Sequence, residues 1–301
     1  MKKLFVLLIL MGLTLPMIAQ VKVPEMRTRK LTSMTNKEVE DYLARNDVII
    51  IPCGPIEMHG LMPLEAEYIG PLGWAIKMAE KADALVFPHF AFLYPGGTTS
   101  GKGTFYMSGI ESSQLLMNIC KQLVRQGFKR FFFVSGHGPA TYTIYPVVRE
   151  LYDEYGIPAM ETSRIISEAR AKVTGPTDKT FYGLYKIAGQ LEDIPLGVVL
   201  PKSEQMTMPA PGAPRPPTAL NMGMGNIYSY ESEHSWSPDQ PLTEELRARY
   251  AEEGVAQVDK IVAQMDFEPL LKVMNDQIKR YNEELIPKFK ELLNFKKYKV
   301  D

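Results

Sequence analysis

Two short apolar runs constrain the fold of this chain more than any other feature of its sequence. Val48 to Ile51 is β-branched throughout and is closed by Pro52 and Gly54, and Phe131 to Val134 is followed by Gly136. A short run that is apolar at every position is typical of a strand buried on both faces of a parallel sheet. Each run leads into a glycine-flanked turn that carries a histidine.

Helical and further strand patterns alternate with these two runs. They predict a helix over residues 73–81, a strand over 84–87, a helix over 115–124, a helix up to Tyr155 and a strand near Ile157. Ser112 or Ser113 is the expected cap of the second helix, and Gly127 is its expected end. This alternation predicts an α/β fold, layered as α/β/α around a mostly parallel sheet.

The second half of the chain contains an irregular segment. Pro201 to Pro217 holds six prolines and cannot be a regular element. We interpret residues 201–225, rich in proline and methionine, as a loop within a single domain over residues 20–301. Two helices, over Thr243 to Met265 and Leu270 to Phe295, are expected to close that domain.

Charge and cysteine content exclude several classes of partner. The 34 Lys and Arg residues nearly balance the 35 Asp and Glu residues, for a formal net charge of −1. Nucleic acid is therefore not expected as a partner, because phosphate binding needs a surplus of basic side chains. Two cysteines in 301 residues exclude a disulfide scaffold and a four-thiolate zinc site. Cys53 and Cys120 are expected to be buried free thiols.

The first nineteen residues resemble a secretory signal peptide. Lys2 and Lys3 precede an apolar run from Leu4 to Ile18, and Ala19 offers a small residue for cleavage. The alternative, a membrane anchor, needs about 20 apolar residues, more than this run contains. We therefore expect export to the periplasm or the medium. No later segment is long and apolar enough to hold the cleaved chain in a membrane.

Carboxylate and imidazole side chains follow the two buried runs. Glu57 and His59 come after the first run, and His137 comes after the second. Ligands bind beyond the carboxyl ends of the strands in open α/β sheets, so these turns are expected to meet. Imidazole and carboxylate are the ligand types of catalytic zinc and manganese sites. The alternative is that these are ordinary turn residues that cap helices.

The motifs around these residues resemble those of the creatininase (creatinine amidohydrolase) family. Members carry a Glu-x-His-Gly turn after a strand, then Pro-Leu and an Asp, later Gly-Thr, an Asn-Gly-His-Gly turn and a His-Ala-Gly-x-x-Glu-Thr segment. The similar segments here are Glu57-Met58-His59-Gly60, Pro63-Leu64, Gly103-Thr104, Ser135-Gly136-His137-Gly138 and Ile187-Ala188-Gly189-Gln190-Leu191-Glu192-Asp193. The resemblance covers roughly residues 47–193.

This resemblance implies a doubly wound, creatininase-like α/β fold and a metal site that opens linear or cyclic amides of small molecules. One or two divalent ions, zinc, manganese or iron, are implied as cofactors, and a homo-oligomer as the assembly. Glu57 and His137 would hold one ion, and His59 and Glu192 the other. The bridging Asp of the family has no identical match. Glu67, one residue short of its place, is the nearest carboxylate, and Glu65 is the alternative.

Several family positions are substituted. Met62, Ser135 and Ile187 stand where the family has His, Asn and His. An amine leaving group needs a proton donor, and Lys186 and His234 are the candidates that replace the missing His. A second interpretation is therefore a catalytically degenerate relative that binds a ligand without converting it.

A third interpretation is an exported copper-binding protein. Thioether sulfur suits Cu(I), and methionines gather near the proposed site and its loop. They are Met62, Met206, Met208, Met222 and Met224. The simpler explanation is that methionine fills irregular gaps in a core or lines an adaptable pocket.

Overall fold

The computed structural model describes residues 25–98, 101–199 and 237–289. Its centre is a four-stranded sheet in the order β2-β1-β3-β4, and all three strand pairs are parallel. The strands are β1 (Val48–Pro52), β2 (Leu85–Val86), β3 (Arg130–Val134) and β4 (Ala159–Glu161). In this register Ile50 lies opposite both Phe132 and Val86. The two apolar runs are thus the central strands, which confirms the predicted α/β fold.

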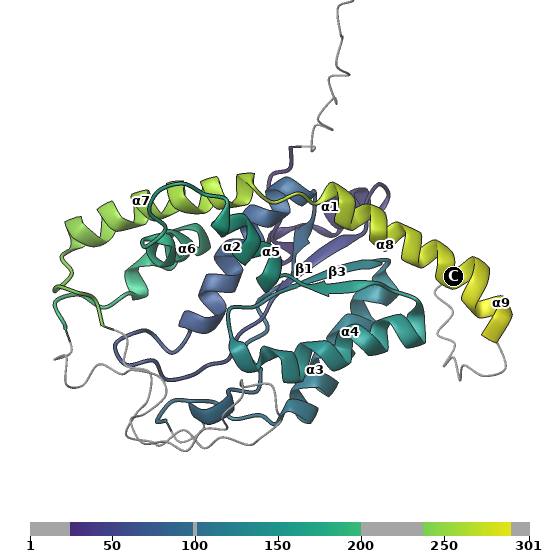
Figure 1. Cartoon of the computed structure of the whole chain (residues 1–301), viewed down its shortest axis with the longest axis horizontal. Helices are drawn as coiled ribbons and strands as arrows, with labels where there is room; N and C mark the ends of the chain where they lie inside the picture. The colour runs from purple at the N-terminus through teal and green to yellow at the C-terminus, as the bar shows by residue number, and fades with distance from the viewer. Residues whose placement is uncertain (1–24, 99–100, 200–236, 290–301) are drawn as a thin grey trace, which may run out of the picture.

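Helices cover both faces of the sheet (Figure 1). They are α1 (Asn36–Leu43), α2 (Ala66–Ala82), α3 (Gly109–Gln126), α4 (Thr141–Tyr155), α5 (Ser163–Ala171), α6 (Thr180–Ala188), α7 (Glu244–Ala263), α8 (Glu268–Arg280) and α9 (Ile286–Phe289). Short 3₁₀ turns span Leu31–Ser33, Gly96–Thr98, Gly138–Ala140 and Leu191–Asp193, and a π-helical turn spans Tyr281–Leu285. No helix of the described residues is both long and apolar enough to span a membrane.

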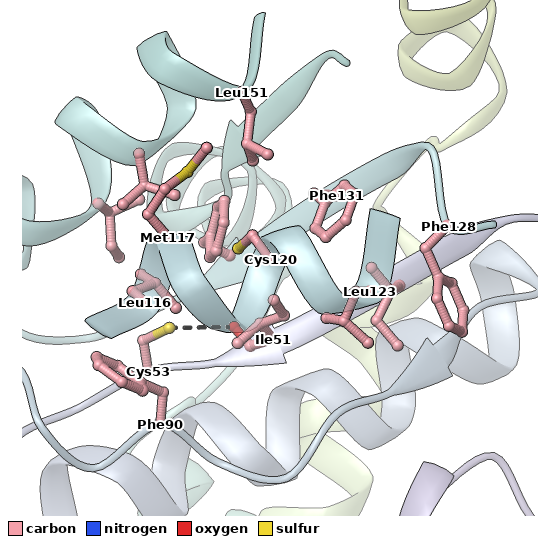
Figure 2. Packing of buried hydrophobic residues seen from close by; sticks show 14 of the residues in the cluster. Ile51, Cys53, Phe90, Leu116, Met117, Cys120, Leu123, Phe128, Phe131 and Leu151 are labelled. Carbon is pink, nitrogen blue, oxygen red and sulfur yellow. Dashed lines mark hydrogen bonds between the residues drawn. The ribbon is translucent and has the colours of Figure 1, made fainter. Parts of the chain in front are cut away.

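Alternate residues of the central strands supply two separate cores, because successive side chains of a strand point to opposite faces. Ile49 and Ile51 belong to the core beneath α3 and α4. Ile51 lies there with Leu116 and Phe131 (Figure 2). Cys53 and Cys120 lie in this core as free thiols with no exposed area, which confirms the prediction for both. Burial raises the pKa of each thiol.

The second core lies on the other face of the sheet. Val48 and Ile50 pack there against Trp74 and Met78 of α2 and against Ile261 of α7. α6 lies between these two helices and contacts both. The central strands are therefore covered by helices on each face, as the apolar runs predict.

The structure corrects some predicted element ends. Ser108 caps α3, in a reciprocal capping box with Glu111, whereas Ser112 is buried inside the helix. Gly127 ends α3 with a positive φ of 112°, as expected. The predicted last helix is interrupted by the π-helical turn after α8, and residues 290–301 lie outside the described part. So do the predicted signal peptide over residues 1–19 and the loop over residues 201–225.

Candidate metal centre

The two histidine-bearing turns meet at one edge of the sheet. β1 leads to Glu57 and His59, and the neighbouring parallel strand β3 leads to His137. α2 begins beside them and carries Glu67 in its first turn, where the helix dipole favours a negative charge. The turns and the helix start bring these four side chains together.

The two imidazoles each face both carboxylates. His59 Nε2 lies 3.4 Å from Glu57 Oε1 and 3.2 Å from Glu67 Oε1. His137 Nδ1 lies 3.6 Å from Glu57 Oε2 and 3.5 Å from Glu67 Oε2. Each carboxylate therefore spans the two rings, and Glu67 lies between the histidines.

The second nitrogen of each ring faces a backbone carbonyl. His59 Nδ1 lies 3.4 Å from the Glu57 carbonyl, and His137 Nε2 lies 3.1 Å from the Tyr94 carbonyl. A proton on that nitrogen leaves the carboxylate-facing nitrogen with a lone pair. Histidines that ligate metals commonly have this arrangement, since a carbonyl fixes both the tautomer and the ring orientation.

Burial and neighbouring charges shift the pKa values of this cluster in opposite directions. Glu57 is 2% exposed, and burial raises its pKa to about 7. Burial also acts on Glu67, but the imidazoles of His137 and His59 outweigh it and hold the pKa of Glu67 well below its usual range. The pKa of His59 is lowered by burial and raised by the carboxylates of Glu67 and Glu57, and the rise is larger.

Two carboxylate oxygens of the cluster are buried without a hydrogen-bond partner, Glu57 Oε2 and Glu67 Oε2. A buried anionic oxygen without a partner costs roughly 1–3 kcal/mol or more, and a cation would remove that cost. Two carboxylates and two imidazoles are also a suitable donor set for zinc or manganese. Each imidazole contacts both carboxylates directly. Across the described residues, no group of three or more His, Cys, Asp or Glu side chains is spaced so that it could hold a metal ion as it stands. The four side chains therefore suit a divalent ion in the chemistry of their donor atoms but not in their present spacing.

Gly54, just after β1, lets the backbone of Glu67 lie close to the turn, because glycine has no side chain. A Cβ atom at Gly54 would lie 2.0 Å from the carbonyl oxygen of Glu67 and 2.7 Å from the Cα atom of Tyr68. The helical partner of that carbonyl would be the N–H of residue 71, which is Pro71 and has none. The start of α2 can therefore lie directly against the turn after β1.

Comparison with known proteins agrees with this architecture. The model of the creatininase family, described as creatinine amidohydrolase, matches residues 32–189, about half of the chain. The chain belongs to the creatininase family. A creatinine amidohydrolase from Pseudomonas putida is 29% identical over 111 residues, which are 35% of this chain and 43% of that relative. The match thus spans less than half of its length.

Solved creatininase structures share the fold. A tryptophan-to-phenylalanine mutant described as "creatininase, Type II" superposes with a TM-score of 0.51 at 19% identity, covering 82% of this chain and 99% of that one. A second tryptophan-to-phenylalanine mutant of creatininase gives a TM-score of 0.50 at 18% identity, covering 84% and 99%. The creatininase-like layered fold is thereby confirmed.

The remaining predicted site residues lie elsewhere in this creatininase family member. The structure does not bring Glu192 to the four: its side chain is 81% exposed and pairs with Arg247. The Lys186 ammonium pairs with Glu252 of α7, so it does not serve the cluster in this arrangement. His234 lies outside the described residues, as do four of the five methionines of the copper interpretation.

Two groups near the cluster could not be identified from the sequence. Tyr94 acts through its backbone carbonyl, so no property of its side chain marks it. Gln190, two residues before Glu192, donates a hydrogen bond from its side-chain amide to Glu65 Oε2 at 3.3 Å. The resemblance pointed to Glu192 in this segment, and not to Gln190.

Proposed function

We propose that this protein is a metal-dependent hydrolase that cleaves a C–N bond, in a linear or cyclic amide, of a small molecule. The observation that carries the proposal is the convergence of Glu57, His59, Glu67 and His137, with a carbonyl behind each imidazole and a partnerless oxygen on each carboxylate. Membership of the creatininase family and the creatinine amidohydrolase from Pseudomonas putida support it.

The four side chains would hold one divalent ion, zinc, manganese or iron. Such an ion, when bound, lowers the pKa of a water molecule and polarises the amide carbonyl. The two carboxylates neutralise its charge, and the two carbonyl-fixed imidazoles offer it lone pairs in a set orientation. A second ion, as the family resemblance implies, would need further ligands, and the exposed Glu192 is poorly placed to be one.

A specific observation favours the second candidate, a ligand-binding relative without turnover. Ile187 stands in place of the family's His and packs against the apolar core behind α2. The adjacent Lys186 is occupied by Glu252. Without a proton donor the amine would leave poorly. His234 remains a candidate donor in the hydrolase proposal.

Metal analysis tests both candidates. The protein comprising residues 20–301 is purified, and its zinc, manganese and iron contents are measured. The same protein is screened for hydrolysis of small amides. The hydrolase proposal expects about one equivalent or more of metal and turnover of at least one amide, with both lost in His137→Ala. His89→Gln is the matched control, because His89 stacks on Tyr68, with ring centroids 4.2 Å apart, and no hydrogen bond or ion pair of the described residues joins it to the four. Bound metal without turnover of any amide would favour the ligand-binding relative. No metal in the folded protein, even after zinc or manganese is added, would end the hydrolase proposal.

We also propose export through residues 1–19 and assembly into a homo-oligomer. Cell fractionation would place the protein and give the mass of the processed chain. Light scattering of the purified protein would give the number of subunits.

A further inference from the structure

The two edges of the central sheet differ in how the chain covers them. At the β2 edge, the Arg29 carbonyl accepts a hydrogen bond from the Val86 N–H at 2.8 Å, and Lys30 forms a bridge to Val86. At the opposite edge, β4 is the last strand, and no further segment of the described residues pairs with it. An open edge strand presents unpaired N–H and C=O groups, with which another chain can pair.

The register of β4 identifies these open groups. The Pro158 carbonyl and the Thr162 N–H are hydrogen-bonded to β3. Successive residues of a strand direct their backbone groups to alternate sides, so the N–H and C=O groups of Ala159 and Glu161 point away from β3. Among the residues that the structure describes, no hydrogen bond reaches these four groups.

A groove of about 580 Å³ lies beside the start of this open edge. Ala159 lines it, together with residues of α4 and α8, which pack on opposite faces of the sheet. α4 contributes Tyr145, Val148 and Tyr152, whose spacing of three and four residues places them on one face of the helix. The groove thus combines an apolar helix face with an unpaired strand edge, in a volume typical of binding sites.

The charged side chains that line the groove are both positive. They are Arg149 of α4 and Arg280 of α8. Arg149 pairs with Asp153 and Arg280 with Glu284, each one turn further along the chain, and neither carboxylate lines the groove. Exposed ion pairs of this kind contribute little, so both guanidinium groups are available to an acidic ligand.

We propose that this groove binds an extended peptide segment of a partner protein, as a fifth strand beside β4, through two neighbouring acidic side chains. Main-chain hydrogen bonds to Ala159 and Glu161 would supply affinity. Because successive side chains of a strand point to opposite faces, the two acidic residues would reach Arg149 on the α4 side and Arg280 on the α8 side.

The groove lies outside the proposed metal centre. It shares no residue with the four side chains of that cluster, so the inference does not depend on the hydrolase proposal. β4 of a second copy is a poorer occupant than a partner peptide, because its three residues carry a single acidic side chain.

A set of synthetic peptides tests the groove. The probe is Thr-Val-Glu-Asp-Val-Thr, with a neutral fluorophore on its N-terminus and an amide at its C-terminus. It is titrated into the full purified protein, and binding is followed by fluorescence anisotropy. We expect the probe to bind, and two altered versions to bind at least about tenfold more weakly. One has Gln-Asn in place of Glu-Asp, and the other carries methyl groups on its four central amide nitrogens, which remove the strand hydrogen bonds.

Hydrogen exchange and protein variants locate the binding site. The Ala159 and Glu161 amides should exchange more slowly when the probe is bound. Arg149→Gln with Arg280→Gln should weaken the probe by about tenfold or more and leave the Gln-Asn peptide unchanged. Arg249→Gln is the matched control, because Arg249 is an exposed arginine of α7 that pairs with a carboxylate at the same spacing and lies outside the groove.

Several results would overturn the inference. They are no binding of the probe, equal binding of the methylated peptide, undiminished binding by the double variant, and slowed exchange only at amides away from β4. An oligomer that excludes the probe and dissociates in the double variant would also overturn it, since a second copy of the chain would then fill the groove.

Discussion

The Nδ1 atom of His137 lies 3.5 Å from a Glu67 carboxylate oxygen that is buried and has no hydrogen-bond partner. His137 follows β3 and Glu67 lies in the first turn of α2, so two distant segments of the chain meet at this contact. A Glu thus occupies the position between the histidines, where the resemblance implied a bridging Asp. By the same resemblance the preceding loop is one residue shorter than in the family, which would offset the longer side chain.

This match between side chain and loop length is testable. Glu67→Asp should weaken metal binding by about tenfold or more, because the shorter carboxylate no longer reaches both imidazoles. Inserting one leucine between Met62 and Pro63 in the Glu67→Asp protein should restore much of the affinity. The measurement is a competitive zinc titration of all three proteins. Full affinity in Glu67→Asp without the insertion would show that the two lengths are not coupled.

Metal binding should strengthen as the pH rises through neutrality. Burial raises the pKa of Glu57 to about 7, and carboxylates raise the pKa of His59 against the effect of burial. Glu57 therefore holds a proton below about pH 7, and His59 holds its proton to a higher pH than an ordinary histidine. A metal must displace these protons. Calorimetry in buffers of different ionisation enthalpy should therefore detect proton release on zinc binding near pH 7. A pH-independent affinity between about pH 6 and 8 would contradict this linkage.

The close approach at Gly54 gives a third prediction. Gly54→Ala should destabilise the protein by more than about 2 kcal/mol and reduce metal retention, because a Cβ there would meet the Glu67 backbone at 2.0 Å. Gly136→Ala is the matched control in the other turn, since a Cβ there would have nothing within 4 Å. Urea unfolding and elemental analysis measure both effects. Equal behaviour of the two variants would mean that the start of α2 can shift freely.

The central strands could be predicted because they are apolar at every position, a pattern that few other elements share. The start of α2 could not be predicted, because Gly70, Pro71 and Gly73 interrupt its helical pattern, which is clear only from residue 73 onward. The helix tolerates Pro71 near its first turn, where the carbonyl left without a donor faces the turn after β1.

The candidate site also has residues that the sequence predicts and residues that it does not. Residues on the two turns were predictable from chemistry and from strand order, since neighbouring parallel strands end at one edge. Glu67 needed the family resemblance, because a carboxylate at a helix start is common. The outward position of Glu192 depended on the direction of its side chain in an irregular turn, and sequence spacing does not determine that. The Tyr94 carbonyl carries no side-chain signature at all.

Asp83 gives a prediction about stability away from the site. It ends α2 in the left-handed conformation, with φ of 48°, and its carboxylate pairs with Arg29 at 2.9 Å and with Arg45. Burial raises the pKa of Asp83, but the two guanidinium groups outweigh it and lower the pKa overall. A lowered pKa stabilises the fold above the unfolded value of about 4, and this contribution is lost as the pH falls through the folded value.

Asp83→Asn should therefore lower the free energy of unfolding by about 1–2 kcal/mol at neutral pH, and the difference from wild type should shrink below about pH 4. Asn adopts the left-handed conformation readily, so the change removes charge without straining the backbone. Asp41→Asn is the control, because Asp41 pairs with Lys37 on an exposed helix surface and its loss should leave stability unchanged. Urea unfolding of the three proteins across this pH range measures the effect. A difference for Asp83→Asn that persists undiminished in acid would mean that the αL position or hydrogen bonding, and not the ion pairs, carries the stabilisation.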